Sequence, residues 1–149
     1  MNVGIIGHAS EKFTPVSQSR AIAVIRGILV SCSPDVTVVS GRSPMGGVDV
    51  WAEELAEQMG FGTQIFAPKV RRWSGPGGFK ERNERIALFS DEVHVVVVDD
   101  YPPGYAGMRF KLCYHCGLRD HVKSGACWTA RRAKEEGKPV VLHVVSHTM

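Results

Sequence analysis

The sequence predicts an α/β fold, a three-layer sandwich of about five mostly parallel strands with helices on both faces. Short runs rich in Val and Ile alternate with stretches of helical period, which is typical of a parallel sheet with crossover helices. The chain has 149 residues, of which 44% are hydrophobic and 22% charged, and this suits one core. Because no repeat or low-complexity linker interrupts the pattern, residues 1–149 are expected to form a single domain.

The first half of the chain has three expected strands, at residues 2–6, 36–40 and 63–67. A helix is expected over residues 17–32, with Ser17 as its N-cap. One face of this helix collects the apolar side chains Ile22, Ile25, Ile28 and Leu29. A second helix is expected over residues 47–60, closed by Gly60. Its inward face is predicted to consist of Val48, Trp51, Leu55 and Met59.

The second half continues the alternation, with helices expected at residues 79–91 and 127–137 and strands at 92–100 and 139–145. Residues 101–124 interrupt it. Loops between a strand and a helix usually have about two to six residues, so a segment of this length needs something to order it. We therefore expect an insertion stabilised by a metal ion.

The candidate metal ligands are Cys113, Cys116, His121 and Cys127, in the spacing CxxC-x4-H-x5-C. Three thiolates and one imidazole are a common tetrahedral zinc set, and the string "CYHCGLRDH" is similar to a retroviral-type zinc knuckle. A structural zinc is the favoured interpretation. Three alternatives stay open: His115 as the fourth ligand, a CxxC redox pair, and buried cysteines with no chemistry.

Loops with unusual chemistry follow the strands at the edge where ligands of parallel sheets bind. Gly46 and Gly47 precede one helix, and Ser124 and Gly125 precede another, so backbone N–H groups at two helix starts can approach an anion. Tight turns are the alternative explanation for these glycines. The loops after the first two strands add further candidate ligand contacts, namely Gly7, His8, Ser40 and Gly41.

Three segments carry a resemblance to a known family: "VVSGRSPMGGVDVWAEELAEQMG", "GFKERNERIALFSDEVHVVVV" and "KSGACWTARRAKEEGKPV". They resemble the SLOG superfamily of Rossmann-like nucleotide-binding proteins, which includes LOG-type phosphoribohydrolases, DNA-processing protein A and small stand-alone bacterial or phage proteins. The resemblance covers nearly the whole chain. It implies a ligand site for a nucleotide or nucleotide-derived molecule that contains Gly46, Gly47, Asp49, Arg82, Asn83, Ser124, Gly125 and Thr129.

The chemistry of these side chains agrees with that site, since Arg82 suits phosphate, Asn83 a base or ribose, and Asp49 ribose hydroxyls. The LOG-type enzymes use a glutamate in the motif PGGxGTxxE, and in this chain Arg132 stands in its place. A guanidinium cannot act as the acid or base of glycoside hydrolysis. We therefore expect a binding protein, with a phosphoribohydrolase-like enzyme as the alternative.

Binding of single-stranded nucleic acid is a third possibility. Its candidate residues are the basic pair Arg131 and Arg132 and the aromatic residues Trp73, Trp128, Tyr101 and Tyr105, although Trp128 is expected mostly in the core. The net charge of +3 is small, and the sequence has no visible stripe of basic residues, so nucleic acid is not the favoured partner. A homo-oligomer is possible. No apolar run reaches bilayer length and no secretory signal is visible, so the expected location is the cytoplasm, away from membranes.

Overall fold

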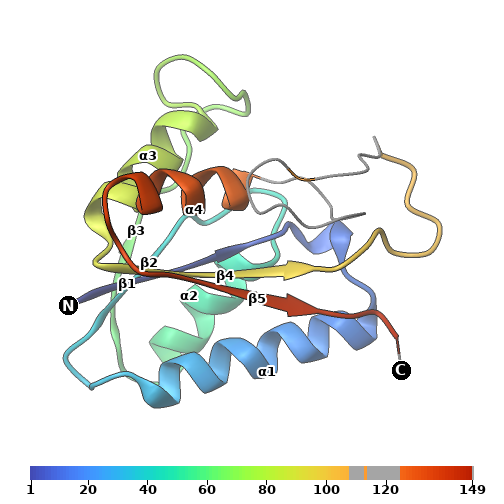
Figure 1. The fold of residues 1–149 in the computed structure, drawn as a ribbon, viewed down its shortest axis with the longest axis horizontal. Helices are drawn as coiled ribbons and strands as arrows, with labels where there is room; N and C mark the ends of the chain where they lie inside the picture. Colours follow the sequence, from blue (N-terminus) through green and yellow to red (C-terminus); the bar gives the residue numbers. More distant parts are fainter. Residues whose placement is uncertain (108–112, 114–124, 149) are drawn as a thin grey trace.

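A computed structural model describes residues 1–107, 113 and 125–148, and it contains a five-stranded, fully parallel sheet (Figure 1). The strand order is β3-β2-β1-β4-β5. The bounds of the strands are β1 Asn2–Gly7, β2 Thr37–Ser40, β3 Gly62–Ile65, β4 Glu92–Val98 and β5 Val140–Val145. The predicted α/β fold and number of strands are confirmed.

Four α-helices connect the strands: α1 Pro15–Ser31, α2 Val48–Gln58, α3 Phe79–Phe89 and α4 Gly125–Glu135. A short 3-10 helix, η1 Ser10–Lys12, lies between β1 and α1. The helices α1 and α2 cover one face of the sheet, and α3 and α4 cover the other (Figure 1). The direction of the connections therefore reverses between β1 and β4, which places the ligand edge of the sheet at that point.

The core consists of two apolar clusters, one on each face of the sheet. Ile25 and Leu29 of α1 pack with Leu55 of α2 on the first face, and Ile86 of α3 packs with Ala133 of α4 on the second. The strand β4 contributes to both clusters. Its last four valines are fully buried, because side chains on either face of a covered parallel strand are in the interior.

Three predicted details of the helices differ in the structure. The first helix begins at Pro15 with Thr14 as N-cap, and Ser17 completes a capping box instead of being the cap. The last helix begins at Gly125, two residues earlier than expected. Met59 was expected to face inward but is 39% exposed, because α2 has ended and the residue is already in its C-cap.

Only part of the predicted insertion lies within the described residues. The described part of the insertion, residues 101–107, starts with Tyr101, whose buried ring stacks on Tyr105 with 4.9 Å between ring centroids. Cys113 is fully buried. Cys116, His121 and Ser124 lie outside the described residues, so the predicted knuckle and one predicted ligand contact cannot be placed. Across residues 1–107 and 125–148, none of the helices has the length and apolar character needed to span a membrane.

Candidate functional site

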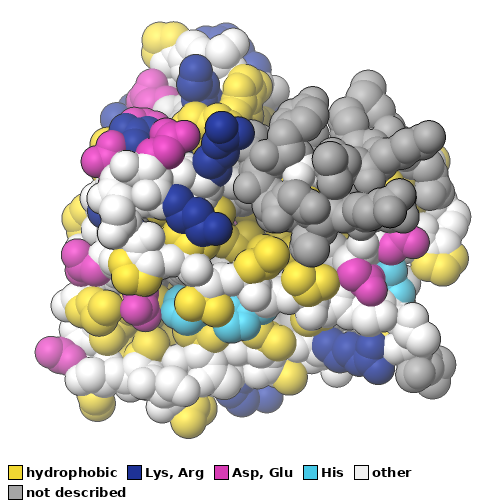
Figure 2. All heavy atoms as spheres, in the orientation of Figure 1, with side chains coloured by type: hydrophobic (Ala, Val, Ile, Leu, Met, Phe, Trp, Pro, Cys, Tyr) yellow, Lys and Arg dark blue, Asp and Glu magenta, His cyan; other side chains and the backbone are white. Residues whose placement is uncertain are grey.

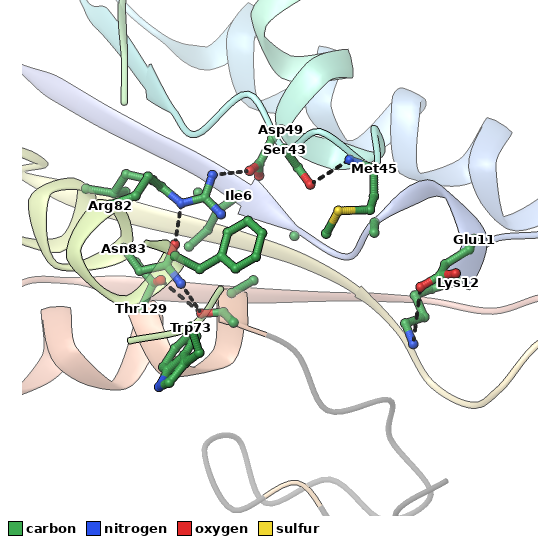
Figure 3. Close-up of a pocket in the computed structure, with 16 residues that line it drawn as sticks. Ile6, Glu11, Lys12, Ser43, Met45, Asp49, Trp73, Arg82, Asn83 and Thr129 are labelled. Atoms are coloured by element: carbon green, nitrogen blue, oxygen red, sulfur yellow. Dashed lines mark hydrogen bonds and ion pairs between the residues drawn. The ribbon is translucent and has the colours of Figure 1, made fainter. Parts of the chain in front are cut away.

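A pocket of about 220 Å³ opens at the carboxyl edge of the sheet, where the strand order reverses (Figure 3). The starts of α2, α3 and α4 meet there with the end of β1. Six residues that the sequence predicted as ligand contacts line the pocket: Gly7, Asp49, Arg82, Asn83, Gly125 and Thr129. They come from four elements, β1, α2, α3 and α4, so the fold brings together residues that are far apart in the sequence.

The pocket contains a buried pair of opposite charges, Asp49 from the first turn of α2 and Arg82 from α3 (Figure 3). The two residues are 6% and 9% exposed. Asp49 Oδ2 and Arg82 Nη1 are 3.7 Å apart, which is an ion pair but longer than a hydrogen bond. Asp49 Oδ1 is buried, and among the described residues no donor forms a hydrogen bond of normal geometry with it, although the Gly7 backbone also interacts with this carboxyl. Leaving such an atom unpaired is unfavourable, so a ligand donor would be stabilised here.

The environment changes the acidity of both members of this pair. Burial raises the pKa of Asp49 to about 6, and Arg82 and the Gly7 backbone offset part of that rise. Burial also lowers the pKa of Arg82, against the influence of Asp49, but a guanidinium stays protonated in proteins. Asp49 therefore changes its charge within the pH range in which a general acid or base operates.

The guanidinium of Arg82 is held in place by its neighbours. Its Nε donates to Asn83 Oδ1 at 2.7 Å, and its Nη1 donates to the Gly41 carbonyl oxygen at 2.5 Å. A Cβ on Gly41 would overlap Nη1, so only glycine permits this approach. Phe79 packs under the guanidinium, 5.5 Å from ring centroid to Cζ. These contacts use Nε and Nη1, so Nη2 is the guanidinium nitrogen that would donate to an anion in the pocket.

Asn83 and Thr129 fix the start of α4 beside α3. Thr129 Oγ1 donates to the Gly125 carbonyl oxygen at 2.9 Å, and Asn83 Nδ2 reaches the same oxygen at 3.5 Å. A Cβ on Gly125 would lie 2.9 Å from Asn83 Nδ2, so the close contact between the two helices depends on this glycine. The first turn of α4 is thereby placed at the wall of the pocket.

The start of α2 is shaped by two glycines with positive φ, Gly46 at 74° and Gly47 at 96°. A Cβ on Gly47 would overlap the carbonyl oxygen of His8, which accepts a hydrogen bond from Val48 N at 3.1 Å. The loop after β1 is therefore pressed onto the helix start. No described side chain caps α2, which is compatible with the predicted anion site at its N-terminus.

His8 and Ser40 lie behind the pocket instead of lining it. The Oγ of Ser40 is 3.1 Å from the carbonyl oxygens of Ile5 and Asp49, so it joins β2 to β1 and to α2. The Nδ1 of His8 accepts from Val98 N at 3.2 Å, and the residue is 1% exposed. Both residues support the site through the backbone, and Ser40 positions the residue that carries the buried carboxylate.

Sequence reasoning missed several residues that line the pocket, among them Phe79, Ile86, Lys12 and Trp73. Phe79 and Ile86 stand at helical spacing with Arg82 and Asn83, so extending the predicted site along that helix face would have found them. No comparable signal existed for Lys12, which ends the short helix η1, and Trp73 was named from the sequence only as a stacking residue for nucleic acid. The fold alone determines that both reach this pocket.

Arg132 and Trp128 also differ from expectation. Arg132 donates to both carboxylate oxygens of Glu84, at 3.0 and 3.1 Å, and to Glu136 at 2.5 Å, and it does not line the pocket. It joins α3 to α4 in an ion-pair network. Trp128 is only partly buried, forms a T-shaped pair with Trp73 at 5.5 Å between ring centroids, and belongs to neither apolar cluster, so the expectation that it is mostly in the core is wrong.

Two of the four predicted metal ligands are described, Cys113 and Cys127, and both belong to the apolar cluster beneath α3 and α4. Cys127 lies in the first turn of α4, the helix whose start lines the pocket, so a metal ion bound to its thiolate would be attached to the wall of the pocket. Within the described residues no three His, Cys, Asp or Glu side chains gather as a metal site, but Cys116 and His121 lie outside that part of the chain.

Comparisons with known proteins add no assignment. No family model, no curated protein and no solved structure matches this chain. The resemblance to the SLOG superfamily therefore stays a prediction, and the function has to be argued from the geometry of the pocket.

Proposed function

We propose that the protein binds a nucleotide or a nucleotide-derived ligand in the pocket at the carboxyl edge of its sheet. The observation that carries this proposal is Asp49 Oδ1, which is buried beside the pocket with no well-formed hydrogen bond among the described residues, while Oδ2 faces Arg82. A carboxylate oxygen in this state needs a hydrogen-bond donor, and a ribose hydroxyl supplies one.

The rest of a nucleotide suits the remaining walls. Arg82 and the helix starts of α2 and α4 favour a phosphate group through charge and backbone N–H groups. Phe79 and Trp73 offer aromatic surface to a base. The pocket of about 220 Å³ is open at one side, so a ligand of nucleotide size need not be fully enclosed.

Calorimetric titration of purified protein with nucleoside monophosphates tests this proposal. We expect Asp49→Asn to weaken binding by about tenfold or more, because the amide offers a donor where an acceptor is needed. Arg82→Ala should weaken binding of the monophosphate more than binding of the nucleoside. Arg85→Ala is the matched control, because Arg85 is exposed on the same helix and pairs with Glu81. Equal affinity in wild type and Asp49→Asn would refute the proposal.

A phosphoribohydrolase-like activity is the second candidate, and one observation favours it. The acid that the LOG-type motif lacks in this chain has a possible substitute in Asp49, whose pKa is raised to about 6 by burial. A carboxyl of this acidity can assist attack of water on the anomeric carbon. Release of free base and ribose phosphate from a monophosphate, lost in Asp49→Asn but kept in Arg85→Ala, would establish this activity. Its absence in wild type leaves the binding function alone.

We also propose the structural zinc, held by Cys113, Cys116, His121 and Cys127 in a reducing cytoplasm. Its support is that the two candidate cysteine ligands that are described, Cys113 and Cys127, are buried in one cluster, where thiolates would be stabilised by a bound cation. Elemental analysis of protein purified without added zinc is expected to give about one zinc per chain. Cys127→Ser should lose most of the metal and weaken nucleotide binding, whereas Cys32→Ser should change neither. Wild-type zinc content far below one per chain would exclude this zinc site.

A further inference from the structure

The segment between β3 and the first turn of α3 concentrates positive charge. Residues 66–80 contain no acidic residue, and Lys69, Arg71, Arg72 and Lys80 are all exposed. None of these four cations forms an ion pair with a described residue within 4.0 Å. We call residues 66–80 the basic loop. In Figure 1 it extends beyond the amino end of α3, and Figure 2 shows Lys and Arg side chains on this side of the molecule.

The basic loop is fixed by its own hydrogen bonds. Lys69 N donates to Gly77 O at 2.8 Å, Phe79 N donates to Arg72 O at 2.8 Å, and Lys80 N donates to Trp73 O at 2.9 Å. Gly77 adopts φ of 75°, which closes the turn. A loop that is ordered before binding presents its cations without a large loss of entropy on association.

Trp73 connects the basic loop to the pocket. It is 42% exposed, it lines the pocket, and it packs at right angles to Trp128 of α4. A large aromatic side chain held at the rim of a pocket in this way leaves one ring face available for stacking. Aromatic stacking contributes about 1–3 kcal/mol per nucleic-acid base and tolerates any base.

The two arginines of α4 are already neutralised. Arg131 pairs with Glu135, and Arg132 is shared between Glu84 and Glu136. The pair that the sequence singled out for nucleic acid is therefore engaged in ion pairs within the helices. The unpaired charge lies instead on the basic loop, which the sequence did not mark as a surface.

We propose that the basic loop binds the phosphate backbone of a single-stranded nucleic acid whose terminal nucleotide occupies the pocket. The inference rests on the proposed nucleotide site, and it adds a polymeric ligand. Trp73 stacks on the base next to the pocket, and the cations of the basic loop neutralise the phosphates that follow. A chain with regularly spaced negative charges and flat bases matches both features of this surface.

Calorimetric titrations with a mononucleotide and with an unlabelled single-stranded octamer test the inference, each in DNA and RNA form. We expect the octamer to bind at least about tenfold more tightly, since one stacked base and a few phosphate contacts suffice for that gain. The affinity for the octamer should fall steeply with salt. The double variant Arg71→Ala and Lys80→Ala should remove the advantage of the octamer and lower its salt slope by about 1.4, while mononucleotide affinity stays unchanged. Arg20→Ala with Arg26→Ala, on α1, is the matched control.

The outcomes separate this inference from the proposed nucleotide site. Equal affinity for octamer and mononucleotide overturns the inference and leaves the nucleotide site intact. An affinity that rises with the number of phosphates on a mononucleotide, but not from mononucleotide to octamer, also overturns it. Octamer binding that depends on the basic loop but is unaffected by Asp49→Asn would support the basic loop as a nucleic-acid surface. It would refute the proposal that the terminal nucleotide occupies the pocket.

Discussion

At the scale of single residues, Asp49 is the most informative position in the chain. The sequence placed it in an early helical turn, where a carboxylate is favourable beside the helix N-terminus. The structure adds that the side chain is nearly fully buried and that only one of its oxygens faces a cation. Burial was not visible from the sequence, because it depends on α3 crossing the end of β2 and on the missing side chain of Gly41.

Burial of Asp49 predicts a specific dependence of stability on pH. Its pKa rises from 3.8 to about 6 on folding, so the folded state binds this proton more tightly than the unfolded chain. The corresponding stabilisation is complete below pH 3.8 and is lost as the pH rises through 6, by about 3 kcal/mol in total. Urea unfolding of wild type and Asp49→Asn at pH 4 to 8 measures it. We expect the difference in free energy of unfolding to change by about 2 kcal/mol between pH 4 and 7, which is most of the total. A constant difference would contradict the prediction.

At the scale of elements, the helix starts determine the site. Those of α2 and α4 bring glycines close to neighbouring backbone or side chains, and α3 supplies the residues between them. Sequence periodicity located all four helices, because each has an apolar face that must be buried. It misplaced the start of the last helix, since Gly125 is a poor helix former on its own and is held there by contacts with Asn83.

A substitution at the start of α2 tests how strongly the loop after β1 is pressed onto it. Gly47→Ala should destabilise the protein by about 2 kcal/mol or more, because φ is 96° and the added Cβ would overlap the backbone of His8. Gly60→Ala is the control: its φ is 85° but nothing lies within 4 Å of the added Cβ, so only the conformational cost of about 1 kcal/mol applies. Chemical denaturation measures both. Equal losses in the two variants would show that the contact with His8 is unimportant.

At the scale of the whole molecule, the reversal of strand order creates the pocket. Segments that are separate in the sequence, near residues 7, 49, 82 and 125, meet there. The edge strand β5 exposes Val141, Leu142 and Val144, which gives the predicted homo-oligomer a possible contact surface. Native mass spectrometry of the purified protein would report oligomeric state, bound metal and retained ligand together, and a dimer that Val144→Lys dissociates would identify this edge as the interface.

The sequence by itself determined the class of fold and the number of strands and helices, and it named six of the residues that line the pocket. It could do so because burial on both faces of a parallel sheet requires apolar runs, and helices require a periodic apolar face. Only the tertiary structure decided which charges remain available. It paired Arg132 with two glutamates. Among the described residues, it also left Asp49 Oδ1 without a well-formed hydrogen bond and the cations of the basic loop without an ion pair. Whether a charged group is paired depends on its distance from side chains of other elements, and those distances are fixed only when the chain has folded.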